Sequence, residues 1–118
     1  MQKIAIVVLS VTESGEGLGR IVNALTAAKE YKEAGDELSI SFTGAGTKWP
    51  AALNDSAHPA HALYQAVQDR VAGACGYCAN AFGQTDAVRA CGMPLLEDFG
   101  QNMSFRKLTQ AGYQIVTF

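Results

Sequence analysis

The spacing of apolar and polar positions changes from one segment of the chain to the next, and each segment predicts one element of secondary structure. The run 4–9 is nearly continuous and rich in β-branched residues, which is typical of a strand covered on both faces of a parallel sheet. Apolar residues then recur at helical spacing up to about Ala34, where Gly35 is placed to end the helix. Alternation over 38–42 predicts a second strand.

The second half of the chain continues this order. Apolar residues at helical spacing predict a helix that has Pro59 in its first turn and reaches Val71, and 71–75 is short and apolar enough for a third strand. A continuous helix is expected from Ala79 to Cys91. The remaining segments predict a fourth strand, a helix and a fifth strand at 94–96, 105–111 and 113–118. Strands that alternate with helices predict an α/β fold with a mainly parallel, five-stranded sheet.

The length, net charge and apolar runs of the chain limit the classes of protein to which it can belong. A chain of 118 residues, with no linker or repeat, predicts a single domain over residues 1–118. The net charge of −2 and the lack of a Lys/Arg stripe argue against a nucleic-acid partner. No apolar run approaches the roughly 18 residues of a membrane span, and the first strand lacks the features of a signal peptide. We therefore expect a cytoplasmic protein without a membrane partner.

The sequence Cys75-Gly76-Tyr77-Cys78 is the main candidate for chemistry. Cys75 falls at the end of the third strand and Cys78 at the start of the next helix, where the helix N-terminus favours an anion such as a thiolate. Cys75 would be the nucleophile, and Cys78 could resolve an adduct on it. Two small residues filling a tight corner, or a thioredoxin-like dithiol, are the alternatives. Cys91, about 18 Å along the expected helix from Ala79, is expected to be a core residue.

Two histidines raise the question of a metal. His58 and His61, together with the cysteine pair of the turn, make an H-x2-H … C-x2-C set that could bind zinc. The spacing fits no common zinc finger, and Pro59 between the histidines can turn His58 away. Two exposed histidines in a loop are the favoured interpretation, so neither a metal nor another cofactor is expected.

A glycine-rich segment, 44–48, follows the second strand but lacks the spacing of a phosphate-binding loop, so nucleotide binding is disfavoured. Lys48 could place a positive charge near the thiolate. Trp49, the only tryptophan, is either a packing residue or part of a lid or subunit contact.

Several segments, spread over essentially the whole chain, are similar to segments of one known family. The chain resembles DsrE/DsrF-like proteins in the segments 17–20, 42–49, 75–83, 94–96 and 112–118. The resemblance implies a flavodoxin-like three-layer sandwich and assembly into homotrimers or homohexamers. It also implies a sulfur-relay role in which one cysteine carries a persulfide, and that position corresponds to Cys75. Where sulfur-relay members have Arg-Gly, this chain has Phe82-Gly83. Lys48, Trp49, Tyr77 and Asn80 lie in the matching segments and are expected to support the site.

The functional expectation is a sulfur carrier, or sulfurtransferase-like protein, that holds a persulfide on Cys75 with help from Cys78. Its partners would be sulfur donor and acceptor proteins or small thiols. Two alternatives stay open. One is a dithiol redox protein or sensor that uses the same two cysteines. The other is a non-catalytic oligomeric binding module whose subunit contacts lie around Trp49 and Phe99.

Overall fold

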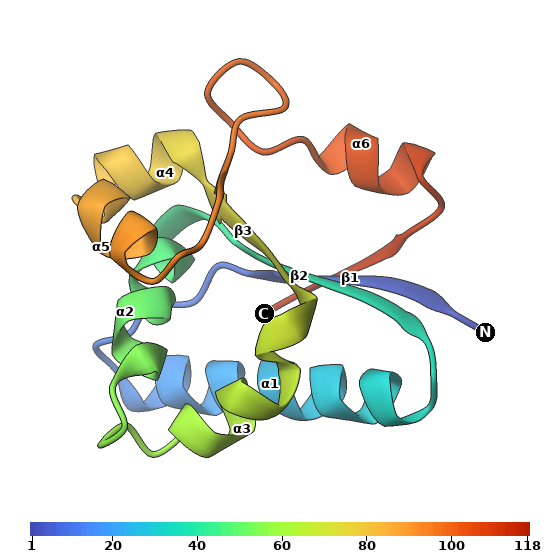
Figure 1. Ribbon diagram of the computed structural model, residues 1–118, viewed down its shortest axis with the longest axis horizontal. Coiled ribbons are helices and arrows are strands. Elements are labelled where there is room, and N and C mark those ends of the chain that lie inside the picture. The colour runs from blue at the N-terminus through green and yellow to red at the C-terminus, as the bar shows by residue number, and fades with distance from the viewer.

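The computed structural model describes residues 1–118 and is built around one sheet of five parallel strands (Figure 1). The strands lie in the order β4-β3-β2-β1-β5, and every neighbouring pair is parallel. Their bounds are β1 Lys3–Val8, β2 Glu37–Phe42, β3 Val71–Cys75, β4 Leu95–Leu96 and β5 Gln114–Thr117. The predicted α/β fold with a mainly parallel five-stranded sheet is confirmed, and all five strands are parallel.

Helices cover both faces of the sheet, so the predicted three layers are also confirmed (Figure 1). Helices α1 (Gly15–Glu33) and α3 (His61–Val67) pack on one face, and α6 (Phe105–Gln110) lies over the other. Four short helices surround the carboxyl ends of the strands: η1 Gly44–Lys48, α2 Trp49–Asn54, α4 Gly76–Ala81 and α5 Thr85–Ala90. A fifth, η2 Gln68–Arg70, directly precedes β3. No helix has both the length and the apolar character needed to span a bilayer.

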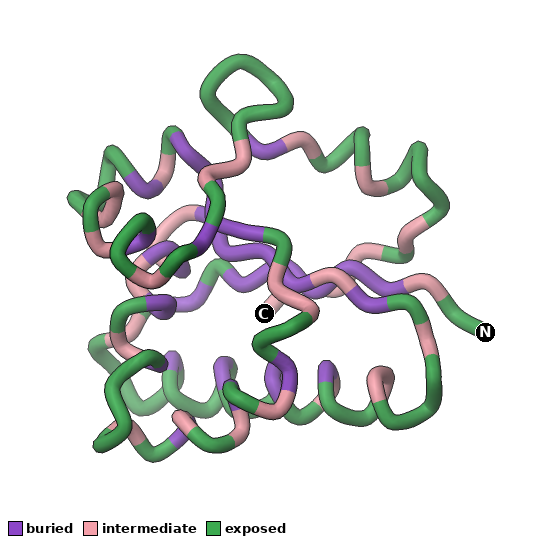
Figure 2. Tube along the Cα trace, viewed as in Figure 1, coloured by how far each residue is buried: buried purple, intermediate pink, exposed green.

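The two faces of the sheet differ in how much they bury (Figure 2). Successive strand residues point to opposite faces, so Ile6 and Val8 of β1 face α1 while Val7 faces α6. The cluster on the α1 face contains 19 buried residues, whereas the cluster on the α6 face contains three: Val7, Cys75 and Met103. We call these the thick face and the thin face. A cavity of about 180 Å³ remains between α6 and the sheet.

Two helix predictions were wrong in their bounds. The expected helix from Ala79 to Cys91 is two short helices, because Gly83 adopts a φ of 67°, which interrupts the helix and is easiest for glycine. The first of them begins before Ala79, directly after the third strand. Val71 belongs to that strand and not to the helix before it, which also begins only after Pro59.

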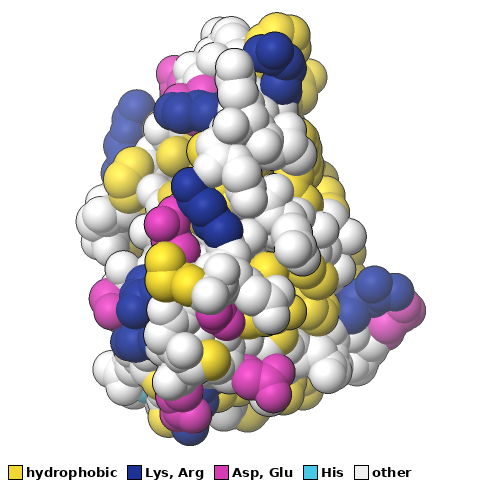
Figure 3. All heavy atoms as spheres, turned by 90° about the vertical axis from the view of Figure 1, so that its right-hand side faces the viewer, with side chains coloured by type: hydrophobic (Ala, Val, Ile, Leu, Met, Phe, Trp, Pro, Cys, Tyr) yellow, Lys and Arg dark blue, Asp and Glu magenta, His cyan; other side chains and the backbone are white.

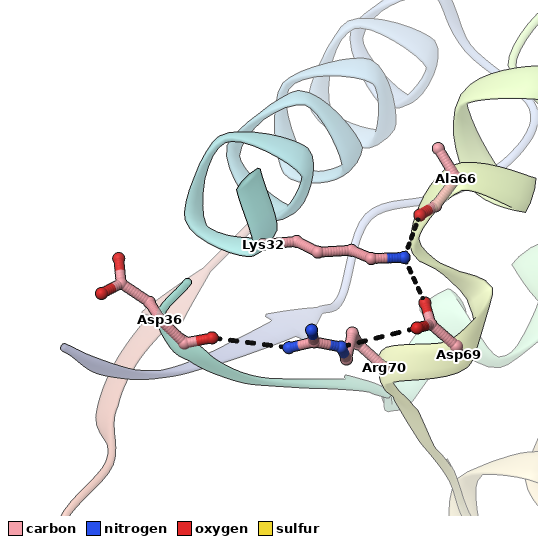
Figure 4. Close-up of polar contacts among 5 residues, drawn as sticks. All are labelled: Lys32, Asp36, Ala66, Asp69 and Arg70. Atoms are coloured by element: carbon pink, nitrogen blue, oxygen red, sulfur yellow. Dashed lines mark hydrogen bonds and ion pairs between the residues drawn. The ribbon is translucent and has the colours of Figure 1, made fainter. Parts of the chain in front are cut away.

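Polar contacts fix the segment that leads into β3 (Figure 4). Near the end of α1, Lys32 donates hydrogen bonds to the Ala66 carbonyl and to Asp69 Oδ1, each at 2.8 Å. Arg70 lies 3.6 Å from the other Asp69 oxygen and donates to the Asp36 carbonyl at 3.4 Å. These contacts attach the segment directly before β3 to α1 and to the turn that precedes β2.

Candidate functional site

Cys75 is the last residue of β3, and its side chain lies on the thin face, where only 1% of it is exposed. Its Sγ accepts a hydrogen bond from the Met103 N–H at 3.4 Å and lies 3.7 Å from Asn102 Oδ1, to which the thiol can donate. The sulfur atom is therefore held between a strand end and a loop that comes 27 and 28 residues later in the sequence.

Two opposing effects act on the Cys75 thiol. Burial acts to raise its pKa, but the N–H groups of Cys78 and Met103 and the side chains of Cys78 and Thr43 favour the thiolate, and the net pKa lies below the ordinary value. Of the two N–H groups, only that of Met103 has hydrogen-bond geometry. The position of Cys75 before a helix N-terminus predicted a lowered pKa. The N–H donor supplied by Met103 was not predicted.

Cys78 lies inside α4 rather than at its start, because that helix begins at Gly76. Its half-buried Sγ is 3.5 Å from Thr43 Oγ1, at the end of β2. All three cysteines are free thiols. The turn thus brings two thiols and one hydroxyl together at the carboxyl ends of β2 and β3.

A loop between β4 and α6, residues 97–104, covers the Cys75 thiol; we call it the covering loop. It protrudes at the top of Figure 1. The Gln101 carbonyl accepts a hydrogen bond from the Tyr77 N–H at 2.7 Å, and Asp98 forms an ion pair with Lys107 at 2.8 Å. Sequence reasoning missed this part of the site, because the segment has no motif and no periodicity that points to a distant cysteine.

Lys48 and Trp49 contribute to the structure near the turn in ways that do not involve the sulfur directly. The Lys48 ammonium pairs with Glu13 at 2.7 Å and lowers the pKa of that carboxyl; it is not among the groups that shift the pKa of Cys75. Trp49 is 1% exposed, and its Nε1 donates to the Ser10 carbonyl at 2.8 Å. Of the two alternatives for Trp49, the structure shows the packing residue.

The other sequence candidates lie at the surface or in the core. Tyr77 is 54% exposed within the turn, and Asn80 is exposed on the wall of a polar pocket. Cys91 is half-buried against the core of the thick face, and burial raises the pKa of its thiol. Its expected place in the core fits this position, although the unbroken helix used to place it does not exist.

The two histidines serve local structure. The His58 Nδ1 accepts from the Ala60 N–H at 3.0 Å, and the His61 Nδ1 lies 2.7 Å from the Leu53 carbonyl. They do not come together with the cysteines of the turn, since no three His, Cys, Asp or Glu side chains are grouped closely enough to hold a metal ion.

Fold and site together define a class of protein: a three-layer α/β protein in which a buried thiol with a lowered pKa lies where an inner strand of the sheet meets a helix. More specifically, the chain belongs to the DsrE/DsrF-like family, which it matches over residues 2–118 and which relates it to sulfur-relay proteins. It is also similar to an uncharacterised protein of Methanocaldococcus jannaschii, with 28% identity over 96 residues, or 81% of this chain and 78% of the relative. Among solved structures, a conserved protein of unknown function from Bacteroides thetaiotaomicron has the same fold: the TM-score is 0.63 at 15% identity, with 97% and 94% of the two chains covered.

Proposed function

We propose that this protein is a sulfur carrier that holds a persulfide on Cys75. The observation that carries the proposal is the sulfur environment: a buried Sγ that accepts the Met103 N–H and has a lowered pKa. A thiolate is the form that attacks sulfur, and an N–H donor that stabilises it also suits the anionic persulfide. Family membership supports the same role, because the family includes sulfur-relay proteins.

The transfer step balances without an external oxidant or reductant. The Cys75 thiolate attacks the terminal sulfur of a donor persulfide R–S–SH and forms a new S–S bond. The S–S bond of the donor breaks, R–S⁻ leaves, and the proton stays on the transferred sulfur of Cys75–S–SH. The reverse step passes the sulfur to an acceptor thiolate. Donor and acceptor proteins, or small thiols, are the proposed partners.

Persulfide-selective labelling followed by mass spectrometry of the peptides tests the proposal after exposure to inorganic polysulfide. We expect one added sulfur on the peptide that contains Cys75, and its loss in Cys75→Ser but not in Cys91→Ser, the matched cysteine control. An unmodified Cys75, under conditions that load an established persulfide carrier, would show the proposal to be wrong.

The presence of two free thiols three residues apart, Cys75 and Cys78, favours a second candidate, a dithiol redox protein or sensor. The Cys78 side chain is one of the groups that favour the Cys75 thiolate. Equilibration with thiol–disulfide buffers tests this candidate. A Cys75–Cys78 disulfide with a reduction potential near cellular poise would support it, and two thiols that stay free under mild oxidant would exclude it.

Assembly into a homotrimer or homohexamer forms part of the proposal. Phe99 is 75% exposed at the tip of the covering loop, and Phe105 is 44% exposed at the start of α6. On the side of the molecule where α6 and the N-terminus lie, hydrophobic side chains reach the surface between charged ones (Figure 3). Such exposed apolar surface is typical of a subunit contact. Native mass spectrometry measures the oligomer number, and a Phe99→Ser variant should dissociate the assembly.

A further inference from the structure

One cationic side chain differs from all the others in having no partner. The chain has nine Lys and Arg residues. Seven of them form ion pairs, and Arg106 donates to Gln110 instead. Arg89, at the end of α5, forms neither an ion pair nor a hydrogen bond, although its guanidinium carries five N–H donors. The guanidinium of an exposed arginine without a protein partner is available to a ligand.

Arg89 lines a polar pocket of about 340 Å³ between α4, α5 and the end of β4. Six other residues complete the wall: Gly76, Asn80, Thr85, Leu95, Glu97 and Gln101. Only Leu95 is apolar, so the wall offers amide, hydroxyl and charged groups rather than a hydrophobic surface. The carboxylate of Glu97 also forms no ion pair, and it lies more than 4 Å from any cation. The pocket therefore contains one free positive and one free negative charge.

Two residues of the pocket wall are close in the chain to Cys75 or to the residues that contact its sulfur. Gly76, which follows Cys75 in the chain, forms part of the wall, and a Cβ there would meet Glu97 Oε1 at 2.6 Å. Glycine at this position thus allows the Glu97 carboxylate to lie against the turn. Gln101 forms another part of the wall, and the next two residues of the covering loop are the ones that contact the Cys75 sulfur.

We propose that this pocket binds a small zwitterionic α-amino acid that carries sulfur, such as cysteine persulfide, as the donor to Cys75. Arg89 would bind the carboxylate through paired N–H donors, and Glu97 would bind the ammonium group. A free inorganic anion fits the pocket less well, because Glu97 would repel it. The inference rests on the proposed sulfur-carrier function and names the class of its donor.

Binding can be measured apart from sulfur transfer. The probe is S-methylcysteine, whose thioether cannot exchange sulfur, titrated into Cys75→Ser protein and followed by chemical shifts of backbone amides. We expect saturable shifts at the pocket, and binding about tenfold weaker or worse in Arg89→Gln and in Glu97→Gln, since each variant loses one charge-assisted contact. Arg106→Gln, which changes the other arginine without an ion pair, is the matched control and should bind normally.

Analogues of the probe separate a zwitterion site from a simple anion site. The analogue without the ammonium group should bind the wild-type pocket more weakly than S-methylcysteine does. It should lose no further affinity in Glu97→Gln, because that variant removes the repulsion between Glu97 and its carboxylate. Absence of saturable binding, or equal binding by Arg89→Gln, would overturn the inference. If Cys75 loads from polysulfide and S-methylcysteine does not bind, the carrier function stands and the donor class is wrong. If the probe binds and Cys75 never loads, the pocket stands and the carrier function fails.

Discussion

The two faces of the sheet contribute differently to this protein: one buries most of the apolar core, and the other holds the candidate site. On the thick face, α1 and α3 help to bury apolar side chains from three strands in one cluster of 19 residues. On the thin face, beside one six-residue helix and the covering loop, the hydrophobic cluster has only three buried residues, and one of them is the candidate nucleophile. Apolar burial is the main source of stability, so the thick face should determine the free energy of unfolding.

The thin face surrounds the Cys75 sulfur with polar groups, and its cover can open locally. The thick face offers neither. Cys75 is 1% exposed, so a donor reaches its sulfur only when the cover moves. That cover is held by a few hydrogen bonds, one ion pair between Asp98 and Lys107 and little apolar surface. Segments of this kind open at a lower free energy than the core does. The comparison predicts that stability and thiol access can be changed independently.

The largest effect is expected from a matched pair of truncations. Leu25 on α1 is 1% exposed in the thick cluster, and Leu25→Ala should destabilise the protein by about 2–5 kcal/mol. Leu108 on α6 is half-buried and borders the existing cavity, so Leu108→Ala should cost about 1 kcal/mol or less. Urea denaturation of both variants measures the difference. Equal losses would mean that the thin face contributes as much to stability as the thick one.

The thick face was also the more predictable of the two. Its residues recur at regular spacing along strands and helices, as in 4–9 and the helix before Gly35, and the alternation of strands with helices follows from that periodicity. The helix break at Gly83 was missed because the apolar spacing continues across it, and only a backbone angle interrupts the helix.

The site could be predicted in part. The position of Cys75 at a strand end follows from the pattern and from the family resemblance, and the structure places it there. Its contacts with Asn102 and Met103 do not follow, because an irregular loop has no periodicity that fixes where it crosses the sheet. The partner of Lys48 was unpredictable for a similar reason: Glu13 lies on a loop 35 residues away.

The second expected effect is an opposite pH dependence of the thiols on the two faces. The pKa of Cys75 is lowered in the folded state, so ionisation favours folding: its contribution is present above the ordinary thiol pKa and is lost as the pH falls through the lowered value. The pKa of Cys91 is raised by burial, so its contribution is full below the ordinary value and is lost as the pH rises toward the raised one.

Two variants isolate these thiols: Cys78→Ser/Cys91→Ser retains Cys75, and Cys75→Ser/Cys78→Ser retains Cys91. Chemical denaturation of each, compared with the cysteine-free protein across the alkaline range, measures the two slopes. We expect stability to rise with pH for the first protein and to fall for the second. Slopes of the same sign would contradict the different environments of the two thiols.

The smallest effect is expected at the covering loop and tests the independence of access from stability. Asp98→Asn removes the ion pair with Lys107, an exposed contact that contributes at most about 1 kcal/mol, so the stability should hardly change. If the pair holds the loop closed, iodoacetamide should alkylate Cys75 up to about fivefold faster in this variant, in the Cys78→Ser/Cys91→Ser background. Glu33→Gln, which removes the Lys29–Glu33 pair of α1, is the matched control and should leave that rate unchanged. If neither variant is alkylated faster than the Cys78→Ser/Cys91→Ser protein, the cover is held by its backbone hydrogen bonds. If both variants are alkylated faster, access to the thiol follows global stability.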